Sequence, residues 1–331
     1  GGTASAVASM SDFVVMSKNA SLFVNGPQVV STTAGKQLTL DDIGGPGASM
    51  RSGMAQLTAE TDEEAIALAR KLIGLLPANN LEEPADFSAD DINRELPALN
   101  AIDKLDDVRD LIKGVADLGD VIEFGEDFAP SMVTAIGKIG GTTVGFLANQ
   151  AGKDEGRLTV YGCKKAARFA AFCDCFSIPI VSIVDSMGMK ISSAPQGELS
   201  RAGAQLMFAL SEATAPRVAL VVGQAIGMSY AAMASRAASD IVYAWPGSVF
   251  STVTAQIAAQ LLYADEMRSA EDPYAKRAEL ERRYMDDVAD AVHAAKAGYV
   301  DDVIEPAATR QMLASALQML AGKRDSRPAK K

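Results

Sequence analysis

Short apolar runs alternate with amphipathic segments over most of the second half of the chain. Four runs have the length and side chains of buried strands, and they cover residues 142–149, 178–185, 217–225 and 241–244. Helical spacing predicts helices over residues 164–175, 199–214, 230–237 and 273–297. Because strands and helices follow one another in turn, the sequence predicts an α/β fold with a mostly parallel sheet.

The last predicted helix, over residues 273–297, has the clearest pattern. Leu280, Tyr284 and Val288 recur every four residues, which places them on one face. Gly298 then supplies a C-terminal stop signal. His293 lies late in this helix, where contact with water or with the last carbonyl groups is a simpler expectation than catalysis.

A polar stretch separates two parts of the chain. Residues 77–97 are rich in Pro, Asn and acidic residues, and they have neither a helical nor a strand period. We therefore expect a linker over residues 81–100, between an N-terminal part (1–80) and a C-terminal part (101–331).

Two distant passages share one design. Gly1-Gly2 precedes a run of small residues, 3–10, that ends in Ser-Asp-Phe-Val-Val, and Gly227-Met228 precedes another, 230–238, that ends in Ser-Asp-Ile-Val-Tyr. Each glycine turn would release the first N–H groups of a short helix that leads into a strand. Two interpretations stay open: turns packed tightly by small side chains, or a pair of oxyanion sites in two duplicated domains.

The composition narrows the classes of function. The 331 residues are 48% hydrophobic and 22% charged, which excludes a disordered chain and a small disulfide scaffold. A formal net charge of -11 disfavours nucleic acid as a partner. The single histidine excludes a mechanism with two imidazoles and a multi-histidine zinc site, so no metal is expected.

The cysteines and the hydropathy of the chain predict its cellular location. Cys163, Cys173 and Cys175 form neither a C-x-x-C pair nor an even framework, so we expect buried thiols in a reducing compartment. The longest apolar stretch, 218–234, is rich in Ala and Gly and falls short of the ~20 strongly apolar residues of a spanning helix. The chain is therefore expected to be soluble and cytoplasmic, with membrane association only through partner subunits.

Ordered motifs along nearly the whole chain resemble one enzyme family. Residues 1–80 contribute Gly1-Gly2, Phe23-Val24-Asn25-Gly26-Pro27, Ile43-Gly44-Gly45 and Leu76-Pro77-Ala78-Asn79-Asn80. Residues 105–310 contribute Gly145-Phe146-Leu147-Ala148-Asn149-Gln150, Lys165-Ala166-Ala167-Arg168-Phe169, Ser211-Glu212-Ala213-Thr214-Ala215-Pro216 and Gly298-Tyr299-Val300-Asp301-Asp302. Together they resemble the carboxyltransferase (beta) component of biotin-dependent acyl-CoA carboxylases and the alpha subunit of sodium-pumping acyl-CoA decarboxylases.

The resemblance implies a crotonase-like fold in two homologous domains, of which the first is incomplete in this chain. It implies transfer of a carboxyl group between carboxybiotin and the α-carbon of a small acyl-CoA such as propionyl-CoA, through an enolate held by backbone N–H groups. The cofactor would be biotin on a separate carrier protein, and coenzyme A would enter as part of the substrate. The implied partners are a biotin carboxyl carrier protein and a biotin carboxylase, around a homo-oligomer that is a hexamer.

The resemblance also implies catalytic roles for five residues. Gly1 and Gly2 match the oxyanion hole that holds the thioester enolate. Gly227, Met228 and Ser229 match the second hole, which faces the ureido oxygen of biotin. In both holes the donors would be main-chain N–H groups, so no acidic or basic side chain is needed at the centre.

Five further residues are candidates for substrate binding. Ala231 matches a position in the lining of the acyl pocket, and Tyr230 lies next to it in the sequence. Lys164, Lys165 and Arg168 lie at the front of a predicted helix. A solvated face is the simpler interpretation of these three cations, and contact with the phosphates of coenzyme A is the alternative.

The chain departs from the family pattern at two places. Ile226-Gly227-Met228 stands where an aromatic residue and two glycines are usual, and Ser186-Met187-Gly188-Met189 stands where Val-Pro-Gly-Phe is usual. The backbone N–H survives at Met228, but this side chain restricts the φ values that glycine would allow.

Two other functions stay open, and part of the family's domain is missing. The opening strands of the first domain and part of the CoA site are expected on a longer polypeptide or a companion chain. One alternative is the alpha subunit of a sodium-pumping methylmalonyl-CoA or glutaconyl-CoA decarboxylase, with membrane decarboxylase subunits as partners. The other is a truncated or degenerate paralogue that binds or scaffolds without catalysis. These residues specify neither the acyl group nor the direction of transfer.

Overall fold

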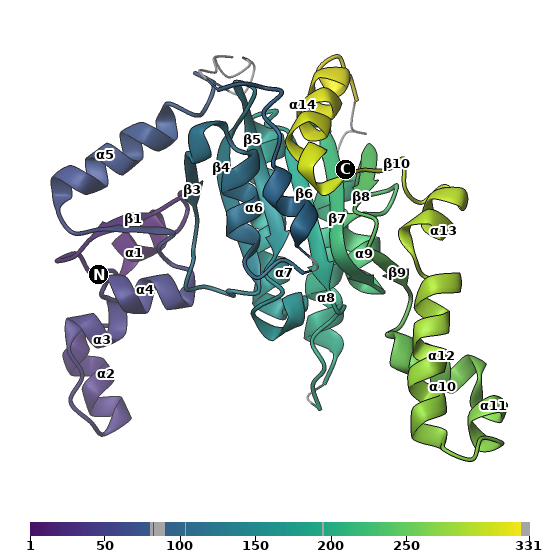
Figure 1. Cartoon of the computed structure of the whole chain (residues 1–331). Coiled ribbons are helices and arrows are strands. Elements are labelled where there is room, and N and C mark those ends of the chain that lie inside the picture. Colours follow the sequence, from purple (N-terminus) through teal and green to yellow (C-terminus); the bar gives the residue numbers. More distant parts are fainter. Residues whose placement is uncertain (80–81, 83–89, 103, 194, 326–331) are drawn as a thin grey trace.

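The main body of the molecule is an α/β unit built on one sheet (Figure 1). The computed structural model describes residues 1–79, 82, 90–102, 104–193 and 195–325. The strands of the sheet are β3 (Val121–Glu123), β4 (Met132–Ile139), β5 (Thr142–Asn149), β6 (Ile180–Ser186), β7 (Arg217–Ile226), β8 (Ile241–Ala244), β9 (Val249–Ser251) and β10 (Asp302–Val303). Their order is β10-β8-β7-β6-β5-β4-β3, and β9 pairs with the last residues of β7.

Continuous apolar runs explain the central strands of this sheet. Both β6 and β8 are buried along their whole length, as expected of strands that are covered on both faces. The sheet is parallel from β5 to β10, whereas β3, β4 and β5 pair antiparallel at the other edge. The four predicted strands and the mostly parallel sheet are confirmed, with bounds that shift by two residues at most.

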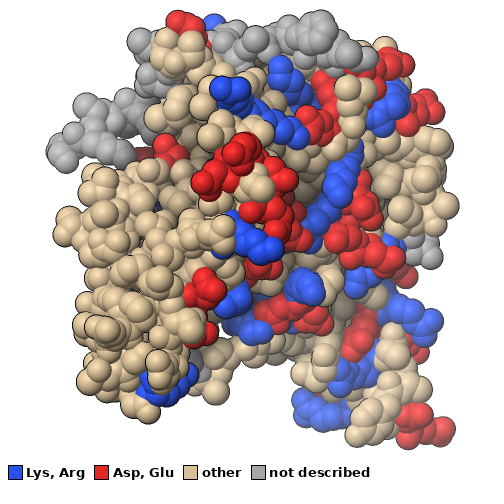
Figure 2. Space-filling model, turned by 90° about the vertical axis from the view of Figure 1, so that its left-hand side faces the viewer, with Lys and Arg blue, Asp and Glu red and all other residues tan. Residues whose placement is uncertain are grey.

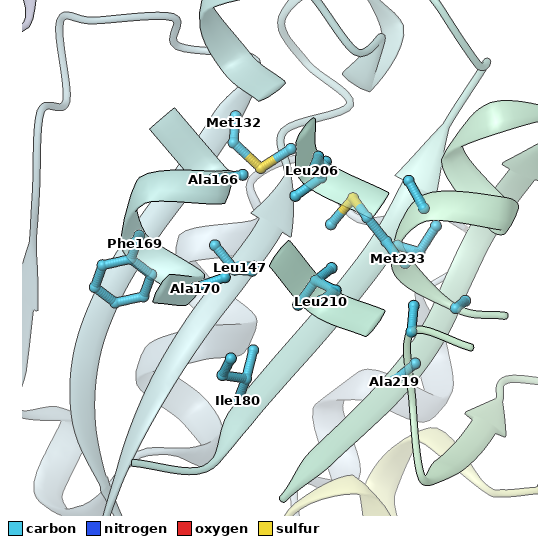
Figure 3. Packing of buried hydrophobic residues seen from close by; sticks show 14 of the residues in the cluster. Met132, Leu147, Ala166, Phe169, Ala170, Ile180, Leu206, Leu210, Ala219 and Met233 are labelled. Carbon is cyan, nitrogen blue, oxygen red and sulfur yellow. The ribbon is translucent and has the colours of Figure 1, made fainter. Parts of the chain in front are cut away.

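Helices cover both faces of the sheet. On one face lie α7 (Val160–Cys175), α8 (Gly197–Glu212) and α9 (Met228–Met233), whose apolar side chains pack with those of the strands (Figure 3). The other face is covered by α6 (Val108–Val115) and α14 (Thr309–Leu320), in a second core cluster. The helix expected over 230–237 begins two residues earlier, at Met228, and ends at Met233. A separate turn follows it, in which the N–H groups of Ala238 and Ser239 donate to the Ser235 carbonyl.

The N-terminal part forms a smaller layer beside β3. It contains a two-stranded parallel sheet of β1 (Val15–Ser17) and β2 (Leu57–Ala59). Five helices surround this sheet: α1 (Thr3–Ala8), α2 (Pro27–Ala34), α3 (Leu40–Gly44), α4 (Pro46–Ser52) and α5 (Asp62–Ile73). Phe13 joins this layer to the main body, because its ring stacks on Phe124 at 4.1 Å between centroids and meets Phe172 edge-on at 4.7 Å.

The helix predicted over residues 273–297 is not continuous, so this prediction is wrong. The expected helix over 273–297 is two helices, α12 (Pro273–Asp287) and α13 (Ala291–Lys296), beside α10 (Ala255–Leu262) and α11 (Ala264–Arg268). The break occurs because the Ala289 carbonyl accepts the N–H of Phe250 in β9, and because Asp290 caps a new helix by accepting the N–H of His293. His293 is therefore the third residue of a short helix.

The described part of the predicted linker is docked on the C-terminal part. Buried Arg310 donates to the Asp91 carbonyl at 3.1 Å and to Asp117 Oδ1 at 2.7 Å. The N–H of Leu96 donates to the Ala307 carbonyl at 2.9 Å, ahead of the 3₁₀ helix Pro97–Ala101. A second 3₁₀ helix, Pro306–Ala308, packs against the first. Residues 80–81 and 83–89 of the expected boundary lie outside the described residues.

The position of each cysteine on α7 decides whether its thiol is buried or exposed. Cys163 and Cys173 are buried, and burial raises the pKa of the Cys163 thiol to about 11. The prediction that all three thiols are buried is wrong for Cys175, which is exposed on the last turn of the helix. Within the described ranges, no helix is both long enough and apolar enough to cross a membrane.

Figure 2 shows the N-terminal side of the molecule, where acidic and basic side chains are interspersed over the centre and right of the view and few lie on the left. Several of these charges form ion pairs between elements. Lys18, just after β1, contacts Glu60 at 2.8 Å, and Lys71 of α5 contacts Asp120. Such exposed pairs contribute little to stability, about 0–1 kcal/mol each.

We expect the central sheet to be the most sensitive part of the fold. Phe146 in β5 is fully buried, so Phe146→Ala should lower the free energy of unfolding by about 3–5 kcal/mol. Phe208→Ala is the matched control, because Phe208 on α8 is 57% exposed and its loss should cost about 0.5 kcal/mol or less. Urea unfolding followed by circular dichroism measures both values, and equal losses would contradict the assignment of the core.

Candidate active site

The first candidate turn lies at the start of α1. Gly2 caps the helix with φ 63° and ψ −136°, a conformation that side chains rarely adopt. Its N–H donates to the Phe23 carbonyl at 2.9 Å and to the Val24 carbonyl at 3.1 Å, and its own carbonyl accepts the N–H of Ser5. Gly1 lies so close to the Phe23 ring that a Cβ there would be 2.4 Å from it. The turn is therefore fixed on both sides.

The second candidate turn, at the start of α9, repeats this geometry. Gly227 caps the helix with φ 54° and ψ −117°. Its N–H donates to the Ser251 carbonyl at 2.7 Å, and its own carbonyl accepts the N–H of Ala231. The Ser229 hydroxyl donates to the Ile226 carbonyl at 2.8 Å and locks the turn from inside. The two turns thus match in dihedral angles, in helix length and in the bond that anchors the glycine.

These bonds change which N–H groups are available. Since Gly2 and Gly227 donate within the chain, the first open donors are the N–H groups of Thr3 and Met228. Neither has an acceptor in the part of the chain that the structure describes, and the first N–H groups of a helix have none within the helix itself. Thr3 was not a sequence candidate, although its place after a capping glycine is a signal that could have found it.

Met228 does not strain the second turn. The left-handed φ belongs to Gly227, while Met228 is the first residue of the helix and adopts ordinary helical geometry. The restriction that a side chain imposes on φ is therefore harmless at this position.

The remaining C-terminal candidates lie on the same helix. Tyr230 is half-buried between Phe250 and Tyr299, edge-on to both at 5.9 and 6.0 Å between centroids. Burial raises the pKa of Tyr230, so this phenol stays protonated at neutral pH. The Ala231 carbonyl accepts the hydroxyl of Ser235 at 2.8 Å. Ser229, Tyr230 and Ala231 are thus brought together with Met228.

The three cations of α7 are not gathered at this turn. With Asp12 and Phe13, they line a cavity of about 220 Å³ between α7 and the N-terminal part. Lys164 is exposed and pairs with Glu198 at 3.0 Å, and Arg168 donates to the Ser11 carbonyl at 2.5 Å.

Lys165 contradicts the expectation of a solvated face. Its ammonium donates to the carbonyl oxygens of Gly125, Phe128 and Met132 at 2.7, 2.9 and 2.7 Å. Burial lowers the pKa of Lys165 to about 8, although Glu123 opposes this shift. With all three N–H bonds in use, this ammonium is not free to bind a phosphate.

Two general features complete the geometry. Figure 1 shows α1 beyond the β3 edge of the main sheet, whereas α9 packs on the inner strands β6 and β7 and against α8. One chain therefore does not bring its two turns together. The described ranges contain no group of three or more His, Cys, Asp or Glu side chains that could hold a metal ion.

The chain matches the family model described as "Carboxyl transferase domain" over residues 1–331. It is 41% identical over 338 residues to the methylmalonyl-CoA carboxyltransferase 12S subunit of Propionibacterium freudenreichii subsp. shermanii, covering 100% of this chain and 64% of the relative. It is 34% identical to methylmalonyl-CoA decarboxylase subunit alpha of Propionigenium modestum, covering 97% of this chain and 64% of the relative. The chain thus spans less than two thirds of these relatives.

A solved structure has the same fold. The transcarboxylase 12S crystal structure, described as a hexamer with methylmalonyl-coenzyme A bound, superposes with a TM-score of 0.94 at 40% identity. The superposition covers 100% of this chain and 65% of that one. The predicted crotonase-like α/β fold is confirmed by this likeness.

Lys165 should make stability depend on pH. The folded chain releases this proton near pH 8, whereas the unfolded chain holds it to about pH 10.5, so the unfolded state binds more protons between these values. The free energy of unfolding of the wild type, minus that of Lys165→Met, should therefore be constant below pH 8 and rise from pH 8 to 10.5. Urea titrations at a series of pH values measure it.

Lys164→Met is the control for that experiment, because it removes one positive charge from the exposed neighbouring position. A wild-type minus Lys165→Met difference that falls with pH, or that follows the Lys164→Met curve, would contradict the burial of the Lys165 ammonium.

Proposed function

Because the chain belongs to the carboxyl transferase domain family, we propose that it acts in a biotin-dependent acyl-CoA carboxyltransferase. The reaction moves a carboxyl group between biotin on a carrier protein and the α-carbon of a small acyl-CoA such as propionyl-CoA. The observation that carries this proposal is the pair of matching glycine-capped turns, Gly2 and Gly227, each followed by an open N–H donor. The names of the relatives agree with this reaction class.

The donors fit the charge that such a reaction develops. Removing the α-proton of a thioester places negative charge on its carbonyl oxygen, and an N–H group at the α1 turn can donate to that oxygen. The N–H groups of Met228 and Ser229 at the α9 turn can donate to an oxygen of the second substrate. Carboxylated biotin, when bound, would supply the carboxyl group by breaking its N–C bond, and the ring nitrogen freed in this way can accept the α-proton.

The position of the donors at helix N-termini also favours binding of the transition state. Helix N-termini carry partial positive charge, which favours an anionic oxygen over a neutral one. One such donor is worth about 2.7–4 kcal/mol of transition-state stabilisation, or a factor of about 10²–10³ in rate. Two turns can therefore supply a large part of the catalysis without an ionisable side chain.

The substrate-binding roles follow from where the side chains lie. Ala231 and Tyr230 stand on the helix that begins at Met228, so we assign them to the wall of the acyl pocket. Lys164 is the remaining candidate for a coenzyme A phosphate, because its exposed ammonium is held only loosely, by an ion pair with Glu198 at 3.0 Å and by the Tyr161 ring at 5.6 Å. Lys165 is withdrawn from this role, since three carbonyl oxygens hold it.

The separation of the turns bears on assembly. Because α1 lies beyond the β3 edge and α9 lies over β6 and β7, one chain keeps the two turns apart, and a site that uses both must combine turns from two subunits. We therefore propose a homo-oligomer, with the hexamer of the transcarboxylase 12S structure as the guide. The partners would be a biotin carboxyl carrier protein and a biotin carboxylase.

A second candidate is the alpha subunit of an acyl-CoA decarboxylase. The identity of 34% to the Propionigenium modestum subunit favours it, because the same turns can stabilise the enolate in either direction. The two functions differ in the partner that purifies with the protein: a soluble biotin carboxylase supports the carboxylase, and a membrane subunit supports the decarboxylase.

Met228→Pro tests the second turn directly. Proline removes the N–H but is favoured at the first position of a helix, so the fold should survive. Transfer of the carboxyl group from methylmalonyl-CoA to free biotin should fall by about 10²–10³ in kcat. Met228→Ala is the control, since it keeps the N–H and should lose less than about tenfold in rate. Product analysis by mass spectrometry follows the transfer.

Equal losses in the two Met228 variants would mean that the side chain, rather than the amide, matters at this position. No transfer by the wild type from any of a panel of small acyl-CoA donors would contradict the proposed function itself.

A further inference from the structure

The side chains of Met189 and Met228, which are far apart in the sequence, both lie close to Gly203 on α8. A Cβ added to Gly203 would lie 3.1 Å from Cε of Met189 and 3.8 Å from Cγ of Met228. Gly203 is buried inside the helix, where glycine is less favourable than alanine. Its backbone has no left-handed φ that would require glycine. The reason for a glycine at this place is therefore the space that its missing side chain leaves.

The backbone on both sides of this space is held firmly. The loop that carries Met189 is anchored because Arg157 donates to the Met187 carbonyl at 2.8 Å and Leu158 donates to the Gly188 carbonyl at 2.9 Å. The turn that carries Met228 is fixed by the bond from Gly227 to Ser251. Neither main chain can shift easily, so a crowded Met228 side chain would have to rotate.

The direction of that rotation matters for the candidate site. Met228 is half-buried, and its side chain leans on α8 while its N–H group remains without an acceptor in the described structure. Met228 packs on the core through this part of α8, so a larger side chain at position 203 would compete with it for that space and can turn it toward the N-terminal end of α9. In that position it would cover the Met228 N–H group, which the proposed function assigns to a ligand oxygen.

We propose that Gly203 is a positioning residue for this turn: its bare Cα gives the side chains of Met189 and Met228 a place against α8, which keeps the Met228 N–H open to the substrate. This inference rests on the proposed function. It also explains why the chain can carry Met189 and Met228 at the two places where it departs from the family pattern. The three residues act as one unit, so a change at one should depend on the others.

The test compares Gly203→Leu and Gly203→Ala in the wild type and in a Met228→Gly background. Gly197→Leu and Gly197→Ala are the matched controls, because Gly197 begins the same helix and a Cβ there meets nothing within 4 Å. Carboxyl transfer from methylmalonyl-CoA to free biotin is measured in the full-length protein, with separate KM values for biotin and for the acyl-CoA. Thermal unfolding is recorded for every variant.

Gly203→Leu should lower kcat/KM for biotin by about tenfold or more, while KM for the acyl-CoA changes less than about twofold, because only the α9 turn is covered. In the Met228→Gly background the same substitution should cost less than about threefold, since no side chain is left to displace. Gly203→Ala should cost about two- to fivefold at an unchanged or raised Tm, because alanine favours the helix. The Gly197 variants should behave like their parents.

Several results would overturn the inference. If the wild type transfers carboxyl groups and the Gly203→Ala variant does so equally well, the inference is wrong but the proposed function stands. Others are an undiminished effect in the Met228→Gly background and equal losses toward both substrates. If Gly203→Leu does not fold, the alanine variant and its Met228→Gly partner decide the question alone. Absence of transfer by the wild type defeats the proposed function and this inference together.

Discussion

Two left-handed glycines set the geometry on which this account depends. Gly2 and Gly227 each turn the chain into a short helix, and each donates its own N–H to the carbonyl of a later segment. That bond fixes the direction of the following N–H group, at Thr3 and at Met228. Because the first turn of a helix cannot satisfy these groups internally, they remain available to an oxygen from outside the chain. The sheet and its helices hold the two turns in place.

A site built from main-chain donors makes modest demands on side-chain identity. Any residue except proline carries the N–H at Met228, so substitution there preserves the donor while changing the packing around it. Residue identity matters more at the neighbouring positions. Gly203 leaves room on α8, and the Ser229 hydroxyl holds the turn by a hydrogen bond. Two of the three cations that were candidates in the sequence make structural contacts instead. Lys165 donates to three carbonyl oxygens, and Arg168 donates to the Ser11 carbonyl.

The sequence predicted β5, β6, β7 and β8 well because these strands are largely buried and read as apolar runs, but it did not predict β3, β4, β9 and β10. It also predicted both glycine turns, from the small-residue runs that follow them. It could not predict that Gly2 and Gly227 use their own N–H groups, because the acceptors are carbonyls of segments distant in the chain. For the same reason it missed the break after α12, which depends on a contact between Ala289 and β9. Local periodicity carries no information about such tertiary bonds.

The most direct measurement is a structure of the assembled enzyme with biotin and an acyl-CoA bound. The account predicts that the ureido oxygen lies about 2.7–3.1 Å from the Met228 nitrogen, with the thioester oxygen at a similar distance from a main-chain nitrogen at the α1 turn of a neighbouring subunit. It would be contradicted if either oxygen were held by side chains elsewhere while the Met228 N–H stayed in contact only with protein or solvent.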